Sequence, residues 1–220
     1  MTSTPPGRGP WRQHDEDDLP VILRAALDCF VSQGYHGTTT RQIAGRSGLS
    51  VPGVYHHHAS KQALLAAVME HAMEDLWWRS QAAAEEAGPT QWEQLAAQVE
   101  CLVLFHSRRQ DLAFISWSEI RSLETEHRVA HIERRDRQQA VVDAIVARGA
   151  AEGVFRAGRP KEAARAITTL CVSVAQWYRA DGPLSPDELA AEYVDLVQGM
   201  LRCGGPAPAP ASGEEISSWA

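Results

Sequence analysis

Aromatic and imidazole side chains gather on one short segment near the N-terminus. Residues 51–57 place Tyr55, His56 and His57 in succession, with few apolar residues left for burial. A short helix with a polar and aromatic outer face is suited to the major groove of duplex DNA, where side chains contact base edges. The chemistry that this segment favours is therefore nucleic-acid recognition.

A second short helix and a tight turn come before this segment. Thr39 and Gln42 have the spacing of a capping box, which satisfies backbone amides at the start of a helix. We expect that helix to end at Ser47 and residues 48–50 to form a turn. Ser50 then caps a helix over residues 51–57, whose first turn tolerates a proline. Two short helices joined by a three-residue turn predict a helix-turn-helix.

Apolar residues at matching positions form the predicted small core of this unit. They are Ile43, Ala44, Leu49 and Val54. The alanine is small enough to let the two helices approach closely. Because this core uses the apolar residues of the second helix, its tyrosine and histidines must face outward.

The distribution of charge supports a polyanionic partner, although the net charge is −7. Residues 19–61 hold four basic residues, one acid and four histidines. Residues 67–220 hold 15 basic and 23 acidic residues. A basic end on an acidic remainder is typical of a local footprint for a nucleic acid.

Other chemistries have weaker support. Three consecutive histidines point about 100° apart on a helix, so residues 56–58 cannot converge on one metal ion. His127 and His131 lie four apart and could bind a metal, but a polar surface face is the better interpretation. The sequence has no nucleophile-elbow, zincin, P-loop or dinucleotide motif, so we expect no catalytic residues, no metal and no cofactor. A cofactor-free helical hydrolase and a protein-binding adaptor are the alternatives.

Helical periodicity and capping signals cover most of the chain and predict an all-α fold of about nine helices. Strand-like alternation is scarce. We expect a disordered arm at 1–17, a helix-turn-helix domain at 18–65, a larger helical domain at 66–203 and a disordered tail at 204–220. The expected helices are 18–33, 39–47, 51–57, 61–86, 90–107, 111–123, 125–152, 160–180 and 185–201.

Composition narrows the cellular setting. Hydrophobic residues make up 44% of the chain, and no apolar run is long enough to span a bilayer. The N-terminus lacks the apolar region of a secretory signal, so we expect a cytoplasmic protein with no membrane partner. Cysteines 29, 101, 171 and 203 form no CxxC pair, which favours buried free thiols.

The segment from Thr39 to Leu65 resembles the DNA-binding domain of the TetR family of bacterial repressors. The matching positions are Thr39, Thr40, Ile43, Ala44, Gly48, Leu49, Ser50, Val54, Tyr55, His57, Ser60, Lys61, Ala63, Leu64 and Leu65. Chain length and helix pattern extend the likeness to the whole chain. The resemblance implies a three-helix helix-turn-helix domain followed by a helical ligand-binding and dimerisation domain.

The resemblance also implies roles for individual residues. The residues implied to contact phosphates are Thr40, Tyr55, His56 and Lys61, and those implied to lie near base edges, with Ser50 beside them, are Arg41, Val51, Gly53 and His57. Lys61 begins a helix, which is a natural phosphate site. His58 departs from the family, which usually carries a core phenylalanine there. The second short helix lacks Arg, Lys, Asn and Gln, so the operator sequence cannot be read from it.

In the larger domain the resemblance implies a homodimer, a palindromic operator and a small-molecule effector that releases the DNA. Two apolar faces agree with pairing of the last two helices: Ala163, Ala166, Ile167, Leu170, Cys171 and Val174 on one, and Leu189, Tyr193, Leu196, Val197 and Met200 on the other. The aromatic and basic candidates for the effector site are Trp78, Phe105, Trp117, Arg121, Arg128 and Trp177.

A weaker likeness concerns the effector. Residues 117–121 and 177–185 look like the branch of the family that responds to acyl-CoA thioesters of lipid or steroid-ring breakdown. This likeness implies that Arg121 or Arg128 anchors an anionic group and that Trp177 walls the acyl or ring portion. A hydrophobic drug or antibiotic is an equally open alternative.

Overall fold

The fold is all-helical over the part of the chain that the computed structural model describes, residues 10–14 and 19–202. This confirms the predicted fold class. The helices are α1 (Val21–Gly37), α2 (Thr40–Ser47), α3 (Val51–His57), α4 (Lys61–Glu86), α5 (Gln91–Arg108), α6 (Gln110–Ser118), the 3-10 helix η1 (Ile120–Ser122), α7 (Thr125–Ala151), α8 (Pro160–Trp177) and α9 (Pro186–Arg202).

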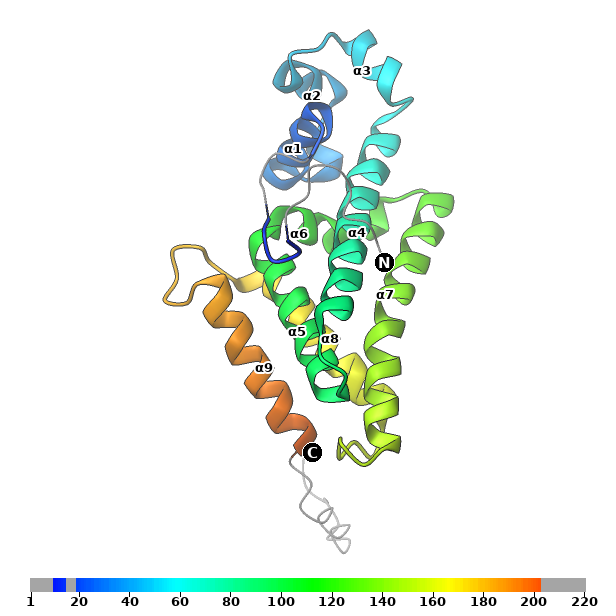
Figure 1. The fold of residues 1–220 in the computed structure, drawn as a ribbon. Helices are drawn as coiled ribbons and strands as arrows, with labels where there is room; N and C mark the ends of the chain where they lie inside the picture. Colours follow the sequence, from blue (N-terminus) through cyan, green and yellow to red (C-terminus); the bar gives the residue numbers. More distant parts are fainter. Residues whose placement is uncertain (1–9, 15–18, 203–220) are drawn as a thin grey trace, which may run out of the picture.

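Figure 1 shows two parts joined by the long helix α4. Helices α1–α3, here called the head, lie around the N-terminal end of α4. Helices α5–α9, together with the rest of α4, form the body. Helix α5 runs through the middle of the body and packs against α4, α7, α8 and α9. Its apolar residues occur on all sides of the helix, as expected for a buried central helix.

Side-chain caps set the starts of the short helices as predicted. Thr39 and Gln42 form the reciprocal capping box of α2. The hydroxyl oxygens of Ser50 and Ser60 accept hydrogen bonds from backbone amides at the starts of α3 and α4. Gly48 follows α2 in the left-handed conformation. These local bonds produce the tight turn between α2 and α3.

The end of α1 differs from the prediction. The predicted helix ends at residue 33, and Gly34 there has a positive φ of 71°, but one more turn follows it and α1 ends at Gly37. The Thr38 hydroxyl donates hydrogen bonds to the carbonyl oxygens of Cys29 and Gly34 and so holds the kinked turn. At the other end, α1 begins at Val21 rather than at residue 18, directly after Pro20.

Two boundaries in the body also differ. Helix α6 ends at Ser118, and only the short helix η1 follows it toward residue 123. Helix α8 ends at Trp177 rather than residue 180, because Tyr178 has an extended backbone. The Tyr178 ring is buried and its hydroxyl donates to the carbonyl oxygen of Leu184, which fixes the turn toward α9.

The N-terminal segment departs from the expected disordered arm. Residues 10–14 pack on the body, and the Trp11 side chain is only 3% exposed. The remaining residues of the expected arm, and the expected tail at 204–220, lie outside the described residues. Cys29, Cys101 and Cys171 are buried free thiols, as predicted, and Cys203 lies outside the described residues.

Candidate nucleic-acid interface and effector cavity

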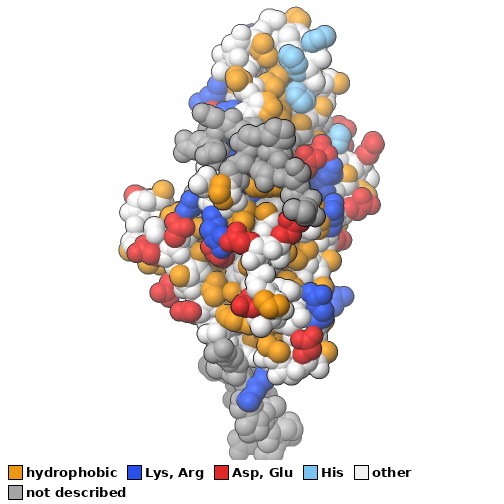
Figure 2. All heavy atoms as spheres, in the orientation of Figure 1, with side chains coloured by type: hydrophobic (Ala, Val, Ile, Leu, Met, Phe, Trp, Pro, Cys, Tyr) orange, Lys and Arg blue, Asp and Glu red, His pale blue; other side chains and the backbone are white. Residues whose placement is uncertain are grey.

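The outer face of α3 is exposed at the tip of the head. Tyr55 is 49% exposed, and His56 and His57 are exposed beside it. Histidine side chains gather at this end of the molecule in Figure 2. Ile43, Ala44 and Val54 are buried beneath the helix. The face therefore presents polar and aromatic groups on a rigid support, as base and phosphate contacts require.

The other candidate DNA-binding residues flank this face. Arg41 and Ser50 are exposed, whereas Thr40, Val51 and Gly53 are half-buried along the first turns of α2 and α3. The prediction that Leu49 belongs to the small core is wrong, because its side chain is 36% exposed in the turn. The core between α2 and α3 is thus formed without Leu49.

Lys61 is engaged within the protein. Its ammonium donates hydrogen bonds to the carbonyl oxygens of Tyr35 (2.8 Å) and Thr38 (2.7 Å) and lies 4.2 Å from the centre of the Tyr35 ring. These carbonyls belong to the end of α1, where positive charge is favourable. Lys61 therefore joins the end of α1 to the start of α4.

His58, the departure from the family pattern, ends α3 and is half-buried. Burial lowers the pKa of His58, and the charge of neighbouring His57 lowers it further. A neutral imidazole thus stands where the family usually has phenylalanine.

A cavity of about 490 Å³ lies in the body between α4, α5, α6, α7 and α8. Its apolar walls come from Met73, Leu76, Leu102, Phe105, Ala113, Trp117 and Val172. Its polar lining comes from His106, Ser116, His131, Arg135, Asp136, Gln138, Gln139, Arg165, Thr168, Thr169, Ser173 and Gln176. An apolar cavity with convergent polar groups is typical of a small-molecule site.

Several residues that line this cavity carry buried polar atoms without a hydrogen-bond partner. His131 is buried, and its Nε2 lies 3.1 Å from the carbonyl oxygen of Ser116, so that nitrogen donates and Nδ1 is an acceptor. Among the described residues, His131 Nδ1, Gln138 Oε1 and the hydroxyls of Ser116 and Thr168 have no hydrogen-bond partner. Such atoms favour a ligand that donates hydrogen bonds.

The burial of His131 also corrects the expectation of a polar surface face at His127 and His131, since the His131 side chain is 3% exposed.

Two arginines stand where the cavity meets solvent. Arg135 on α7 and Arg165 on α8 are exposed and line the cavity, with Asp136 next to Arg135. Guanidinium groups at the rim of an apolar cavity are suited to an anionic group on a ligand whose remainder is buried.

The structure brings only two of the six predicted effector residues to this cavity. Phe105 and Trp117 line it. Trp78 is half-buried on α4, with Arg79 5.5 Å from its ring centre, and Arg121 is exposed in η1. Arg128 is half-buried on α7, and Trp177 is 50% exposed. Those four do not line the cavity.

Sequence reasoning missed the polar residues of the cavity. Gln138 and Thr168 look like ordinary helix residues, and only their contacts show that they face inward. A usable signal did exist for His131, because it is in helical register with Val142 and Ile145 on the buried face of α7. No described group of three or more His, Cys, Asp or Glu residues is arranged to hold a metal ion.

Helices α8 and α9 carry exposed apolar side chains on the surface of the body. Leu170 is 40%, Leu196 58% and Met200 42% exposed. The Trp177 ring stacks on Tyr193, with ring centres 6.5 Å apart. In contrast, Ile167 and Cys171 from the predicted face are buried within the subunit. The outer part of this face is therefore available to another chain.

Family comparisons agree with this arrangement. The family described as "Bacterial regulatory proteins, tetR family" matches residues 22–68, and "Tetracyclin repressor-like, C-terminal domain" matches residues 88–201. The chain belongs to the TetR family. It is a DNA-binding transcription regulator, not an enzyme. This confirms the resemblance of residues 39–65.

Individual relatives extend the match across most of the chain. The transcriptional repressor KstR2 of Mycobacterium tuberculosis is 28% identical over 185 residues, which cover 82% of this chain and 90% of KstR2. A tetR-family regulatory protein from Rhodococcus RHA1 is 30% identical, with a TM-score of 0.76 over 84% of this chain and 97% of its own. AibR in complex with isovaleryl coenzyme A and operator DNA shares the fold, with 24% identity and a TM-score of 0.74 over 82% of this chain and 95% of AibR.

A search of the described helices for a membrane span finds none that is both long and apolar enough.

The buried cavity histidines predict a loss of stability in acid. Burial lowers the pKa of His106 to about 4, and also that of His131 to about 4. Because the unfolded chain takes up these protons near pH 6.5, stability is full above that pH and falls as the pH drops toward 4. The contribution of each histidine should lower the free energy of unfolding by about 2 kcal/mol at pH 5 compared with pH 7.5.

Urea unfolding of His106→Asn at the two pH values, at one protein concentration, measures this contribution. The variant should show an acid loss smaller than that of the wild type by about 2 kcal/mol. His56→Asn, on the exposed face of α3, is the control and should retain the wild-type loss. Equal acid losses in His106→Asn and the wild type would contradict the prediction.

Proposed function

We propose that this regulator is a dimeric repressor that binds a palindromic operator through two copies of α3 and is released by a small effector in the body. The observation that carries the proposal is the course of α4. Its first residue, Lys61, is bonded to the head, and its middle residues Met73 and Leu76 wall the cavity. A ligand that moves α4 therefore changes the position of the head and costs operator affinity. Acting on chromosomal DNA, the protein would work in the cytoplasm.

The exposed face of the head supports the roles that the family implies. Tyr55 and His56 reach phosphates, with Thr40 at the first turn of α2, while Arg41, Val51, Gly53 and His57 lie near base edges and Ser50 beside them. Lys61 contributes to the same interface indirectly, because its ammonium is bonded to the end of α1 instead of reaching a phosphate. Its bonds to α1 position the head, so removing Lys61 also weakens operator binding.

Arg41→Ala tests the base-edge role. The operator is first selected from a random duplex pool by the wild-type protein, and affinity is then measured over a salt series. Loss of this contact should weaken binding by about 1–3 kcal/mol and relax specificity at one operator position. Arg148→Ala removes an exposed arginine of the body instead and should bind as the wild type does. An unchanged affinity of Arg41→Ala would remove Arg41 from the interface.

The exposed apolar side chains of α8 and α9 support the dimer. Two heads in a two-fold dimer would place their recognition helices about one DNA turn, roughly 34–36 Å, apart. This spacing lets one protein dimer occupy both halves of a palindrome, which a single head cannot do.

Leu196→Asp tests the dimer by adding a charge to this face. Sedimentation should show a monomer, and operator affinity should fall because only one half-site is engaged. Val129→Asp, at a 50% exposed residue of α7, is the matched control and should remain a dimer that binds normally. A dimeric Leu196→Asp would place the interface elsewhere.

The cavity supports an anionic amphipathic effector of acyl-CoA type. Its apolar walls would hold an acyl or ring portion, and the open acceptors His131 Nδ1 and Gln138 Oε1 would receive its hydrogen-bond donors. Arg135 and Arg165 at the rim would hold its phosphates. The KstR2 relatives and the isovaleryl-coenzyme-A complex of AibR point to the same class. A neutral hydrophobic drug has no use for the two arginines.

Thermal unfolding with a panel of acyl-CoA thioesters of increasing acyl size, isovaleryl-CoA among them, tests the class. At least one should raise the melting temperature and release the selected operator. Arg165→Ala should weaken that thioester about tenfold, consistent with loss of a hydrogen bond to a charged group, while Arg148→Ala should not. Stabilisation by uncharged hydrophobic compounds alone would favour the drug-type alternative.

A further inference from the structure

The N-terminal segment of residues 10–14, here called the strap, crosses the body rather than the DNA-binding head. Its Trp11 side chain is 3% exposed, and the indole Nε1 donates a 2.8 Å hydrogen bond to Glu86 at the end of α4. The Gln13 amide bonds to the Pro10 carbonyl, which closes the strap into a turn. The strap is therefore a closed turn that the buried Trp11 ring and its hydrogen bond to Glu86 hold on the body.

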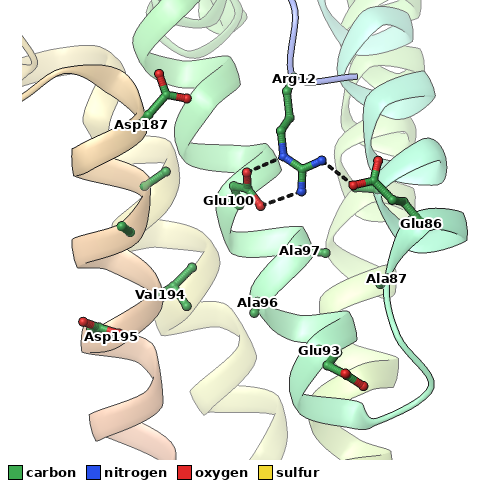
Figure 3. A pocket seen from close by; sticks show the side chains of 13 residues that line it. Arg12, Glu86, Ala87, Glu93, Ala96, Ala97, Glu100, Asp187, Val194 and Asp195 are labelled. Atoms are coloured by element: carbon green, nitrogen blue, oxygen red, sulfur yellow. Dashed lines mark hydrogen bonds and ion pairs between the residues drawn. The ribbon is translucent and has the colours of Figure 1, made fainter. Parts of the chain in front are cut away.

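Arg12 lies at one end of an acidic groove between α4, α5 and α9 (Figure 3). Its guanidinium donates two hydrogen bonds to Glu100, of 2.6 and 3.0 Å, and a third to Glu86. The guanidinium also stacks 3.9 Å from the centre of the Trp11 ring. A two-pronged bond to one carboxylate fixes direction as well as distance. Arg12 thus connects the end of α4 to the middle of α5.

A buried arginine of the body also binds the backbone of the strap. Arg79 of α4 is buried, and its Nη1 donates 2.6 Å hydrogen bonds to the carbonyl oxygens of Trp11 and Gln13. The ring of His14 lies 6.4 Å from that of Phe105, a wall of the effector cavity. The strap therefore contacts α4 and α5, which are two of the five helices that enclose the cavity.

In the sequence, the strap is followed after four residues by Leu19 and then by the head. Leu19 is buried at 5% exposure, and α1 begins two residues later. The head is consequently attached to the body at both of its ends, through α4 on one side and through the strap on the other. A change in head position must be accommodated at both attachments.

We propose that Trp11 and Arg12 position the DNA-binding head, so that the seated strap holds the head in the orientation that binds operator. This inference rests on the operator binding proposed above. Neither residue touches the proposed DNA face. Both act through the path from the strap to α1.

Charge reversal in the groove tests the proposal. Arg12→Glu places a carboxylate among Glu86 and Glu100 and should unseat the strap. Operator affinity should fall about fivefold, the low end of coupling between sites, while helix content and dimerisation stay as in the wild type. Hydrogen exchange should quicken in α1 as well as in residues 10–14.

The double variant Arg12→Glu/Glu100→Arg re-forms an ion pair with the charges exchanged and should recover at least half of the lost affinity. Arg148→Glu carries the same change of net charge on α7, away from the groove, and should leave operator affinity unchanged. If Trp11 only stabilised the fold, its loss would lower the unfolding temperature without changing the operator affinity of the folded protein. The unfolding temperature and the operator affinity of Trp11→Phe are therefore both measured.

Three results would overturn the proposal: wild-type operator affinity in Arg12→Glu, faster exchange confined to residues 10–14, or no recovery in the double variant. Failure of the proposed function gives a different result, because the wild-type protein would then select no duplex at all. In that case exchange in α1 alone decides whether the strap positions the head.

Discussion

A buried ion pair in α4 determines how the parts of this molecule must assemble. Asp75 and Arg79 are 0% and 2% exposed, and Arg79 Nε lies 3.1 Å from Asp75 Oδ1. Arg109, between α5 and α6, places its Nε 3.7 Å from the other carboxylate oxygen. Removing one partner of such a buried pair costs about 3–5 kcal/mol, because a charge is left without compensation. Helices α4 and α5 are therefore held in one register.

The same cluster explains why residues 10–14 pack on the body. Arg79 donates to Asp75 through Nε, and its Nη1 donates to the backbone carbonyls of Trp11 and Gln13. A buried guanidinium without those acceptors would carry a desolvation penalty. The strap thus completes the polar interior of the body. Its position is a consequence of burying charge, and the seating of Trp11 and Arg12 adds to it.

How much of the structure the sequence predicts depends on the range of the interactions involved. The starts of α2, α3, α4 and α5 were predicted because Thr39, Ser50, Ser60 and Thr90 bond to amides only three residues away. Local rules also placed a helix end at residue 33, next to Gly34, whose φ is positive. They did not give the extra turn after it, since that turn is held by the Thr38 hydroxyl bond to Cys29, nine residues away.

The candidate sites follow the same division. The exposed face of α3 could be predicted because a short helix has room for one small core and the other residues face outward. The cavity could not be, because five helices line it and its polar groups are set by contacts such as that between His131 and Ser116. Trp177 is a residue that was predicted for the effector site but lies elsewhere. The likeness to the acyl-CoA-responsive branch implied that it walls the effector site, but its ring stacks on Tyr193 at the surface of α8 and α9.

Polar groups in the middle of the body are costly for a helical bundle. Leucine or valine at Gln138 and Ser116 would pack without open acceptors, and buried polar atoms that lack partners typically cost 1–3 kcal/mol each. A purely structural core has no reason to contain two unpartnered acceptors, His131 Nδ1 and Gln138 Oε1, in residues that line one cavity. In the proposed mechanism an effector supplies the missing donors, so the bound and free states would differ in stability. Because α4 forms both a wall of that cavity and the support of the head, this difference would reach the DNA-binding face.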